Sequence, residues 1–399
     1  MSERRKIGIL TGGGDCPGLN AVIRAATRSA IYLGYEVIGF RKGYEGLADL
    51  DTMELTFHNT AEILNKGGTI LGSTNKGRFS AKVGDNESRE IDPALIDLAV
   101  GNLEKLEVDG LLCIGGDGSL SIAQQLFEAG APCVGVPKTI DNDLACTAFT
   151  FGFDSAVACA ANALDRLHTT ASSHERVMVL EVMGRHAGWI ALHSGLAGGG
   201  DVILIPEIDW TFENVCAKVL HRKQMGKEFT LVVVAEGAQL PGGQLVTLDG
   251  ESKHAQTRLG GIGQLVADEI AKRLEVETRC VVLGHLQRGG QPTYFDRCLA
   301  TQYGAHAVRL VEEKKFGEMV LYDPPNVSSI AITEAVKELS TVDPNGSAVQ
   351  AARAMSVSFG DLPGFENPFP NTQIDEKTFA ERYNLTPSAL ATSKFDDVD

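Results

Sequence analysis

Residues 111–143 read LLCIGGDGSLSIAQQLFEAGAPCVGVPKTIDND, and this stretch decides how the rest of the chain folds. Two apolar runs, 111–114 and 133–136, each end abruptly in small and acidic residues. A helical pattern over 120–129 separates them. The order strand, glycine-rich turn, helix, strand, acidic turn predicts a βαβ unit with parallel strands, whose polar residues gather where the strands end.

The two turns have the composition expected of a phosphoryl-transfer site. The glycines of 115–119 (GGDGS) let the backbone approach a ligand, and amides at the start of the next helix can hold phosphate oxygens. The second turn adds Asp141 and Asp143 to the carboxylate of Asp117. Carboxylates beside phosphate repel it unless a cation lies between them, which indicates Mg²⁺. A carboxylate that is not bound to metal can accept the proton of an attacking hydroxyl.

The rest of the chain alternates strand and helix patterns, which predicts an α/β fold with mainly parallel sheets. The length of 399 residues suggests two domains. We expect two Rossmann-like three-layer domains with the site in the cleft between them. We also expect a helix at 60–66 and a crossover between domains at 241–253. The expected division is 1–140 with 254–310 for the phosphoryl donor, 141–253 with 311–360 for its acceptor, and 361–399 as a C-terminal extension.

The composition excludes some classes of function. The formal net charge of −16, with no basic cluster to offset it, argues against a general nucleic-acid binder. No apolar run approaches the length of a membrane helix, so no membrane partner is expected. The eight cysteines form no CxxC pair. A reduced cytoplasm is the predicted location.

Two further features favour an anionic ligand. The loop 71–78 (LGSTNKGR) combines small residues with two cations and suits a phosphate chain, although a solvated turn explains it equally well. Four arginines, at 176, 185, 279 and 288, lie at edges or ends of predicted strands, where open α/β sheets bind ligands. The glycines at 12–18 match neither the dinucleotide-binding spacing nor a P-loop.

Six ordered segments resemble the 6-phosphofructokinase family: LTGGGDCPGLNAVIR, IGGDGS, PKTIDND, SSHERV, EVMGRHAGW and GHLQRGGQP. The resemblance runs from residue 6 to about 355. It implies a glycolytic, Mg²⁺-dependent enzyme that phosphorylates fructose 6-phosphate on its 1-hydroxyl to give fructose 1,6-bisphosphate. It also implies a homo-oligomer, a dimer or tetramer, in which subunits share active sites.

The resemblance implies roles for individual residues. Asp141 is the base, Asp117 holds Mg²⁺, Asp143 assists charge placement, and Arg185 neutralises the transferring phosphoryl group. The residues implied for the donor are Gly13, Arg78, Gly116, Asp117, Gly118 and Ser119. Those implied for the sugar phosphate are Thr139, Ile140, Asp141, Arg176, Met183, Gly184, Arg185, Glu236, Arg279, His285, Leu286, Gln287 and Arg288; among them Arg176 and Arg279 reach across from a neighbouring subunit.

Two positions track the choice of phosphoryl donor within this family. Gly118 leaves room for the α-phosphate of ATP, where pyrophosphate users carry Asp. Lys138 is instead typical of pyrophosphate users. A lysine holds phosphate without excluding a nucleotide, so the resemblance favours ATP and leaves pyrophosphate as the alternative.

Other readings stay open at this point. The acceptor could be another sugar phosphate, such as sedoheptulose 7-phosphate. A non-catalytic sugar-phosphate-binding regulatory subunit is a rival of a different class, although Asp117, Asp141 and Asp143 are all present. Arg24 and Arg28 match effector-site arginines of bacterial enzymes, and a solvated helix face at i,i+4 spacing explains them equally well.

Overall fold

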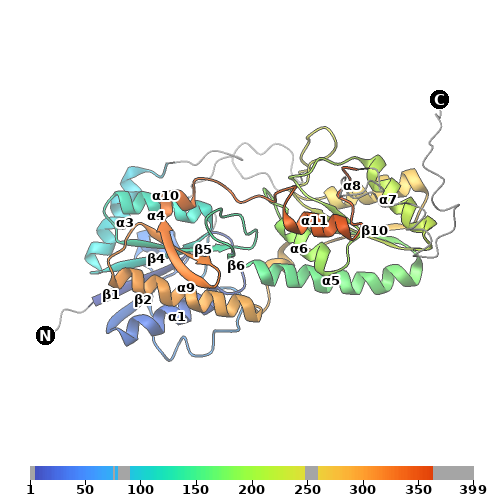
Figure 1. Cartoon of the computed structure of the whole chain (residues 1–399). Coiled ribbons are helices and arrows are strands. Elements are labelled where there is room, and N and C mark those ends of the chain that lie inside the picture. Colours follow the sequence, from blue (N-terminus) through green and yellow to red (C-terminus); the bar gives the residue numbers. More distant parts are fainter. Residues whose placement is uncertain (1–4, 75–76, 80–89, 248–258, 363–399) are drawn as a thin grey trace.

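A computed structural model describes residues 5–74, 77–79, 90–247 and 259–362, which form two sheets in two halves of the molecule (Figure 1). The α/β fold with mainly parallel strands is therefore confirmed. Most of the expected C-terminal extension, residues 363–399, lies outside the described part of the chain. The larger sheet has the order β12-β11-β5-β4-β1-β2-β3, with β6 paired to β5, and the smaller has the order β10-β7-β9-β8.

The larger sheet is parallel at its centre and antiparallel at both edges. Parallel pairing joins β2, β1, β4 and β5, whereas β3 and β12 run antiparallel to their neighbours. The strands are β1 (Arg5–Thr11), β2 (Tyr35–Phe40), β3 (Thr52–Glu54), β4 (Gly110–Gly115), β5 (Cys133–Thr139), β6 (Phe151–Gly152), β11 (Glu318–Asp323) and β12 (Asn326–Ala331).

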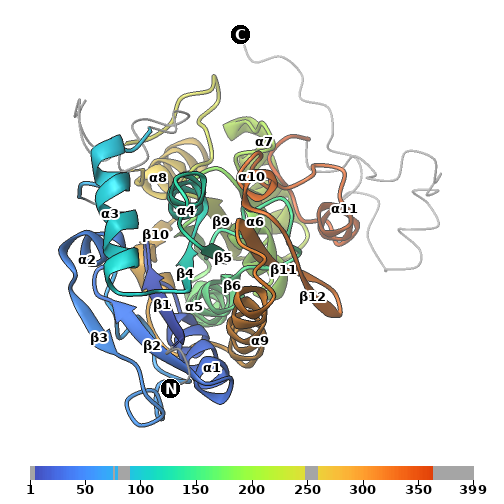
Figure 2. The same ribbon diagram turned by 90° about the vertical axis from the view of Figure 1, so that its left-hand side faces the viewer.

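Alternate side chains of β4 pack on opposite faces of this sheet. Leu112 and Ile114 join the core beneath α1 (Leu19–Tyr32) and α9 (Tyr294–Glu312), and Leu111 and Cys113 join the core beneath α3 (Pro93–Lys105) and α4 (Asp117–Glu128). Figure 2 shows these two pairs of helices on either side of the sheet. A strand buried on both faces needs a continuous apolar run, which is what the sequence supplies at this point.

The smaller sheet is parallel throughout and is also covered on both faces. Its strands are β7 (Val177–Val182), β8 (Val202–Leu204), β9 (Thr230–Ala235) and β10 (Thr278–Val282). Its helices are α5 (Phe153–His174), α6 (Trp189–Ala197), α7 (Phe212–Gln224) and α8 (Ile262–Leu274). The remaining short elements are α2 (Tyr44–Asp49), η1 (Gly284–Arg288), α10 (Ile332–Ala335) and α11 (Ser347–Ala354).

The strand pairing differs from the expected division of the chain at two places. β10 falls within 254–310 but pairs with β7 in the smaller sheet, and β11 falls within 311–360 but pairs with β5 in the larger one. The chain therefore does not change sheets at 241–253. The chain passes from the smaller sheet to the larger one after η1, because the next helix, α9, packs on α1 and on β5 of the larger half.

The helix expected at 60–66 is wrong, since those residues form turns. Thr60 Oγ1 donates to Thr56 O at 2.6 Å, and Asn59 exchanges hydrogen bonds with Thr56 through both side chains. Such side-chain bonds to the local backbone offer an alternative to helical pairing.

Helices α5 and α9 are joined at their N-termini by a buried hydrogen-bond clasp. Asp296 Oδ2 accepts from Ser155 N at 2.8 Å and from Ser155 Oγ at 2.5 Å, and Ser155 Oγ accepts from Thr293 N at 3.0 Å. Thr293 Oγ1 donates to Asp154 at 2.5 Å. Since α5 covers the smaller sheet and α9 the larger, the clasp ties the two halves together. Burial raises the pKa of Asp296 to about 6, although its bonds from Ser155 lower it.

We predict that Asp296→Asn changes how stability depends on pH. The raised folded-state pKa makes the stabilising contribution of Asp296 complete below about pH 4 and lost as pH rises to about 6. The free energy of unfolding of Asp296→Asn, relative to the natural chain, should therefore increase by about 2 kcal/mol between pH 4 and pH 7. Denaturant unfolding at several pH values measures this. Ser155→Ala retains the carboxylate and removes a hydrogen bond that lowers its pKa, so its stability should still fall as pH rises. A pH-independent difference for Asp296→Asn would contradict the prediction.

Candidate active site

The carboxyl ends of β1, β4 and β5 bring the two glycine-rich loops together. Gly12 N donates to Ile114 O at 2.8 Å, and a Cβ on Gly12 would lie only 2.5 Å from Ser119 Oγ. Gly13 has φ +73°, which a side chain would strain. The loop after β1 therefore lies directly against the first turn of α4, as a shared phosphate-binding surface requires.

Helix α4 begins at Asp117, three residues earlier than the sequence pattern indicates. The acidic residue and Gly118 and Ser119 thus form its first turn, with Gly116 as the residue that caps it. Unpaired amides and the positive end of the helix dipole face outward there. This places the residues expected to hold the donor at a helix N-terminus.

Lys138 lies buried among these loops. Its side chain is 4% exposed and its Nζ donates to Gly14 O. A Cβ on Gly13 would be 3.6 Å from that nitrogen. Burial lowers the pKa of the Lys138 ammonium, and the charge of Arg288 lowers it further. Lys138 therefore lies beside the loops that the sequence predicts to bind the donor phosphates.

The smaller sheet contributes a second group of residues beside this one. Glu236 N donates to Val182 O at 2.8 Å and Gly237 N donates to Gly184 O at 3.0 Å, which holds the ends of β7 and β9 together. A Cβ on Gly237 would lie 2.0 Å from Arg185 O, so only glycine fits against that backbone. Arg185 and Gly237 also line a cavity of about 310 Å³ with His186, Pro206, Glu207 and Gln239.

Asp141 carries the most perturbed carboxylate of the site. Its Oδ1 atom is out of contact with solvent and has no hydrogen-bond partner among the described residues. Burial and the charge of Asp143 raise its pKa to about 7, and Arg288 opposes the rise. Glu236 behaves similarly. Burial and the charge of Glu181 raise its pKa to about 7, and the charge of Arg288 opposes this rise. Strongly shifted carboxyl groups are typical of acid–base sites.

Arg288 connects the two halves of the site. Its Nη1 donates to Asp15 O at 3.2 Å in the loop after β1, although η1 follows β10 of the smaller sheet. Three other residues of η1 were expected to bind the sugar phosphate. His285 and Leu286 are exposed, whereas Gln287 is fully buried.

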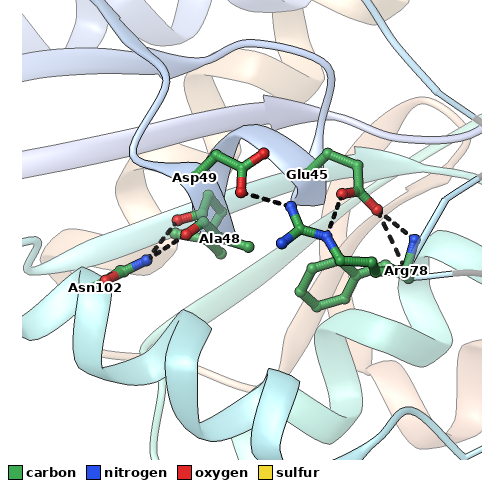
Figure 3. A network of polar contacts seen from close by, with 7 residues as sticks. Glu45, Ala48, Asp49, Arg78 and Asn102 are labelled. Carbon is green, nitrogen blue, oxygen red and sulfur yellow. Dashed lines mark hydrogen bonds and ion pairs between the residues drawn. The ribbon is translucent and has the colours of Figure 1, made fainter.

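Arg78 is held by two carboxylates (Figure 3). Its Nε lies 2.7 Å from Glu45 and its Nη2 lies 2.6 Å from Asp49, both on α2. Asn102 of α3 in turn donates to the carbonyls of Leu47 and Ala48 at 3.0 and 2.8 Å. The loop that carries Arg78 reaches the donor surface at Gly13 N, which donates to Thr74 O at 3.3 Å.

Arg176 and Arg279 lie away from the other candidates. Both pair with Glu277, at 3.0 and 2.7 Å, near the starts of β7 and β10. Met183 and Arg185 follow the opposite end of β7. The structure therefore does not bring these two arginines to the site of their own chain.

Arg24 and Arg28 lie on α1, and the Nε atom of each is buried without a hydrogen-bond partner among the described residues. The Arg28 guanidinium lies 5.5 Å from the centre of the Phe57 ring. Neither arginine adjoins the residues at the carboxyl ends of β4 and β5.

Sequence reasoning missed Glu181, which organises the smaller sheet near the site. This buried carboxylate on β7 accepts from Gly261 N at 3.1 Å and from Gly263 N at 2.8 Å, at the start of α8. An acidic residue inside the otherwise apolar run VMVLEV was the available signal, because a buried charge needs partners. Glu45 and Asp49 gave no comparable signal.

Comparison with known proteins shows which family the chain resembles. Phosphofructokinase is the family that matches residues 6–311. The chain is 51% identical to an ATP-dependent 6-phosphofructokinase of Chloroflexus aurantiacus over 90% of this chain and 99% of that protein. It is 49% identical to a pyrophosphate–fructose 6-phosphate 1-phosphotransferase of Streptomyces coelicolor, over 85% and 96%.

A solved structure is similar as well. Pichia pastoris phosphofructokinase in the T-state superimposes with a TM-score of 0.72 at 31% identity, over 88% of this chain and 39% of the longer yeast chain. This chain shares with that structure an α/β fold of two mainly parallel sheets. The chain belongs to the phosphofructokinase family.

Proposed function

We propose that this chain is a 6-phosphofructokinase that transfers a phosphoryl group, with ATP as the favoured donor, to the 1-hydroxyl of fructose 6-phosphate in glycolysis. The observation that carries the proposal is the partly buried Asp141 carboxylate. It has a solvent-excluded oxygen without a partner among the described residues, and the charges of Lys138 at the end of β5 and of Arg288 after β10 both act on it. Such an oxygen suits the proton of an attacking hydroxyl.

The side chains divide the chemistry between them. Asp141 takes the proton from the sugar hydroxyl, and a pKa near 7 suits a base at neutral pH. Arg185 neutralises charge on the transferring group, and His285 and Arg288 hold the 6-phosphate. The glycine loops and the first turn of α4 position the donor phosphates. Phosphoryl transfer needs positioning and electrostatic stabilisation more than covalent participation, and these groups supply both.

Mg²⁺ belongs to this proposal. The described residues contain no group of three acidic, histidine or cysteine side chains arranged for a metal ion. A phosphate-bound Mg²⁺ needs fewer protein ligands, since it takes one or two carboxylates and fills its remaining positions with phosphate and water oxygens. Asp117, in the first turn of α4, fits that role. When bound, the ion neutralises phosphate charge.

The choice of donor rests on two residues of opposite tendency. Gly118 carries no side chain in the first turn of α4 and so favours ATP. The buried Lys138 supports pyrophosphate as the second candidate donor, because its ammonium bonds to Gly14 O in the glycine-rich loop after β1. Lysine binds phosphate as a point charge and does not exclude a nucleotide.

We also propose that the chain acts in the cytoplasm. No described helix has both the length and the apolar character needed to cross a bilayer. The expectations of no nucleic-acid and no membrane partner stay predictions.

The first prediction from this function concerns the donor. Initial rates with fructose 6-phosphate and Mg²⁺ should be substantial with ATP and at background with pyrophosphate, and Lys138→Met should weaken ATP binding without changing this preference. A coupled assay for fructose 1,6-bisphosphate measures both. Higher turnover with pyrophosphate would reverse the donor assignment, and turnover with neither would support the regulatory-subunit alternative.

Replacing the base should remove catalysis and spare binding. Asp141→Ser is expected to lower kcat about 10²–10⁴-fold, because a positioned general base contributes that much. The kcat/KM of the natural chain should rise with pH and level off above about 7, since the pKa of Asp141 is raised and only its ionised form accepts a proton.

Glu236→Gln is the matched control for this titration. The pKa of Glu236 is also raised to about 7, yet its replacement should leave the rise of kcat/KM in place because it is not the base. Near-normal kcat in Asp141→Ser would refute the assignment of the base to Asp141. So would a kcat/KM of Glu236→Gln that no longer rises with pH.

Arg176 and Arg279 support a shared site between subunits. Both lie at the end of the smaller sheet remote from Asp141, so they can reach a sugar phosphate only in another copy of the chain. We predict that Arg279→Ala weakens fructose 6-phosphate binding. Mixing Arg279→Ala with Asp141→Ser under subunit exchange should restore activity, because some sites then receive both natural residues. No recovery in exchanged oligomers of confirmed mixed composition would argue against sharing.

A further inference from the structure

We infer that Gln287 is a positioning residue that sets the spacing between the two sugar-phosphate segments, and that it does not itself contact the substrate. The inference rests on the proposed function. Its side chain has 0% exposure, although the neighbouring Leu286 is 68% exposed. The side chain points inward from η1, and its Oε1 accepts from Met183 N at 2.8 Å.

The hydrogen bond from Met183 N to Gln287 Oε1 extends the row of hydrogen bonds between β7 and β10 beyond the end of their backbone pairing. β7 and β10 pair from Val177 to Glu181, and Leu283 N then donates to Glu181 O at 3.0 Å. Beyond that point β10 gives way to the single turn of η1. The Gln287 amide provides the next link, between the segment with Met183 and Arg185 and the segment with His285 and Arg288.

The chemistry of the amide fixes which end makes this link. Met183 N–H can only donate, so the carbonyl end of Gln287 must face it. The Nε2 group is then buried with no hydrogen-bond partner among the described residues. Leaving a buried donor unpaired is costly, and an apolar side chain of similar shape would avoid that cost. What glutamine adds over such a side chain is the acceptor for Met183.

The location of Gln287 predicts which substrate should be affected by its loss. Both segments that it joins follow strands of the smaller sheet, whereas the donor loops follow β1, β4 and β5 of the larger one. A misplacement of about 1 Å can cost a positioned substrate about 10²-fold in rate. A shift between the segments of Arg185 and Arg288, which are proposed to hold one phosphorylated sugar, should also weaken its binding. Donor affinity should therefore remain unchanged when the link is removed.

The test compares Gln287→Met with Gln291→Met. Methionine approximates the shape of glutamine without an acceptor, and Gln291 is exposed a few residues further along the same segment. Calorimetric titration with fructose 6-phosphate should show a dissociation constant raised about tenfold in Gln287→Met, the effect of one lost buried hydrogen bond. The dissociation constant of ADP should change less than twofold. Both constants should stay at their natural values in Gln291→Met.

Each other outcome overturns the inference. An unchanged dissociation constant for fructose 6-phosphate, or an equal rise for ADP, shows that Gln287 has no selective positioning role. If Gln287→Met does not fold, Gln287→Asn applies the same test, because its shorter amide cannot reach Met183 N. A natural chain that binds ADP but no fructose 6-phosphate refutes the proposed function itself, which separates that failure from failure of the positioning role.

Discussion

Arg288 supplies the charge on which the candidate site depends. It opposes the rise in pKa that burial imposes on Asp141 and on Glu236, and it bonds to Asp15 O across the two sheets. Partly buried carboxylates without such a cation would be protonated at neutral pH and could not act as bases. The same guanidinium therefore tunes the carboxylates and joins the two halves of the molecule.

The two halves are also held at a second place. The clasp between Ser155 and Asp296 joins the N-termini of α5 and α9, and each helix covers a different sheet. Gln287, directly before Arg288 in η1, instead joins two segments that follow strands of the smaller sheet. Two polar contacts, between Ser155 and Asp296 and between Arg288 and Asp15, thus link the two halves of the molecule, which packing of apolar faces alone would leave loosely specified.

The polar residues of the site differ in how directly they face a ligand. Asp141 and Lys138 are shielded, and burial moves the pKa of both toward neutrality. Arg78 is instead partly exposed and paired with Glu45 and Asp49. Under the proposed function, a donor phosphate would compete with those carboxylates for the Arg78 guanidinium. Lys138 is held instead by the carbonyl of Gly14, so no carboxylate of the described residues would compete with the phosphate for that bond.

Sequence alone determined the βαβ unit and placed Asp117, Asp141 and Arg288 after strands, because strand periodicity and turn residues are local signals. The family followed from the resemblance of six ordered segments. It could not place β10 and β11 in their sheets, since both read as strands and only pairing with β7 and β5 assigns them. The inward direction of Gln287 and the partners of Arg78 were decided by tertiary structure alone. Burial and long-range hydrogen bonds depend on which segments meet, and spacing along a chain does not record that.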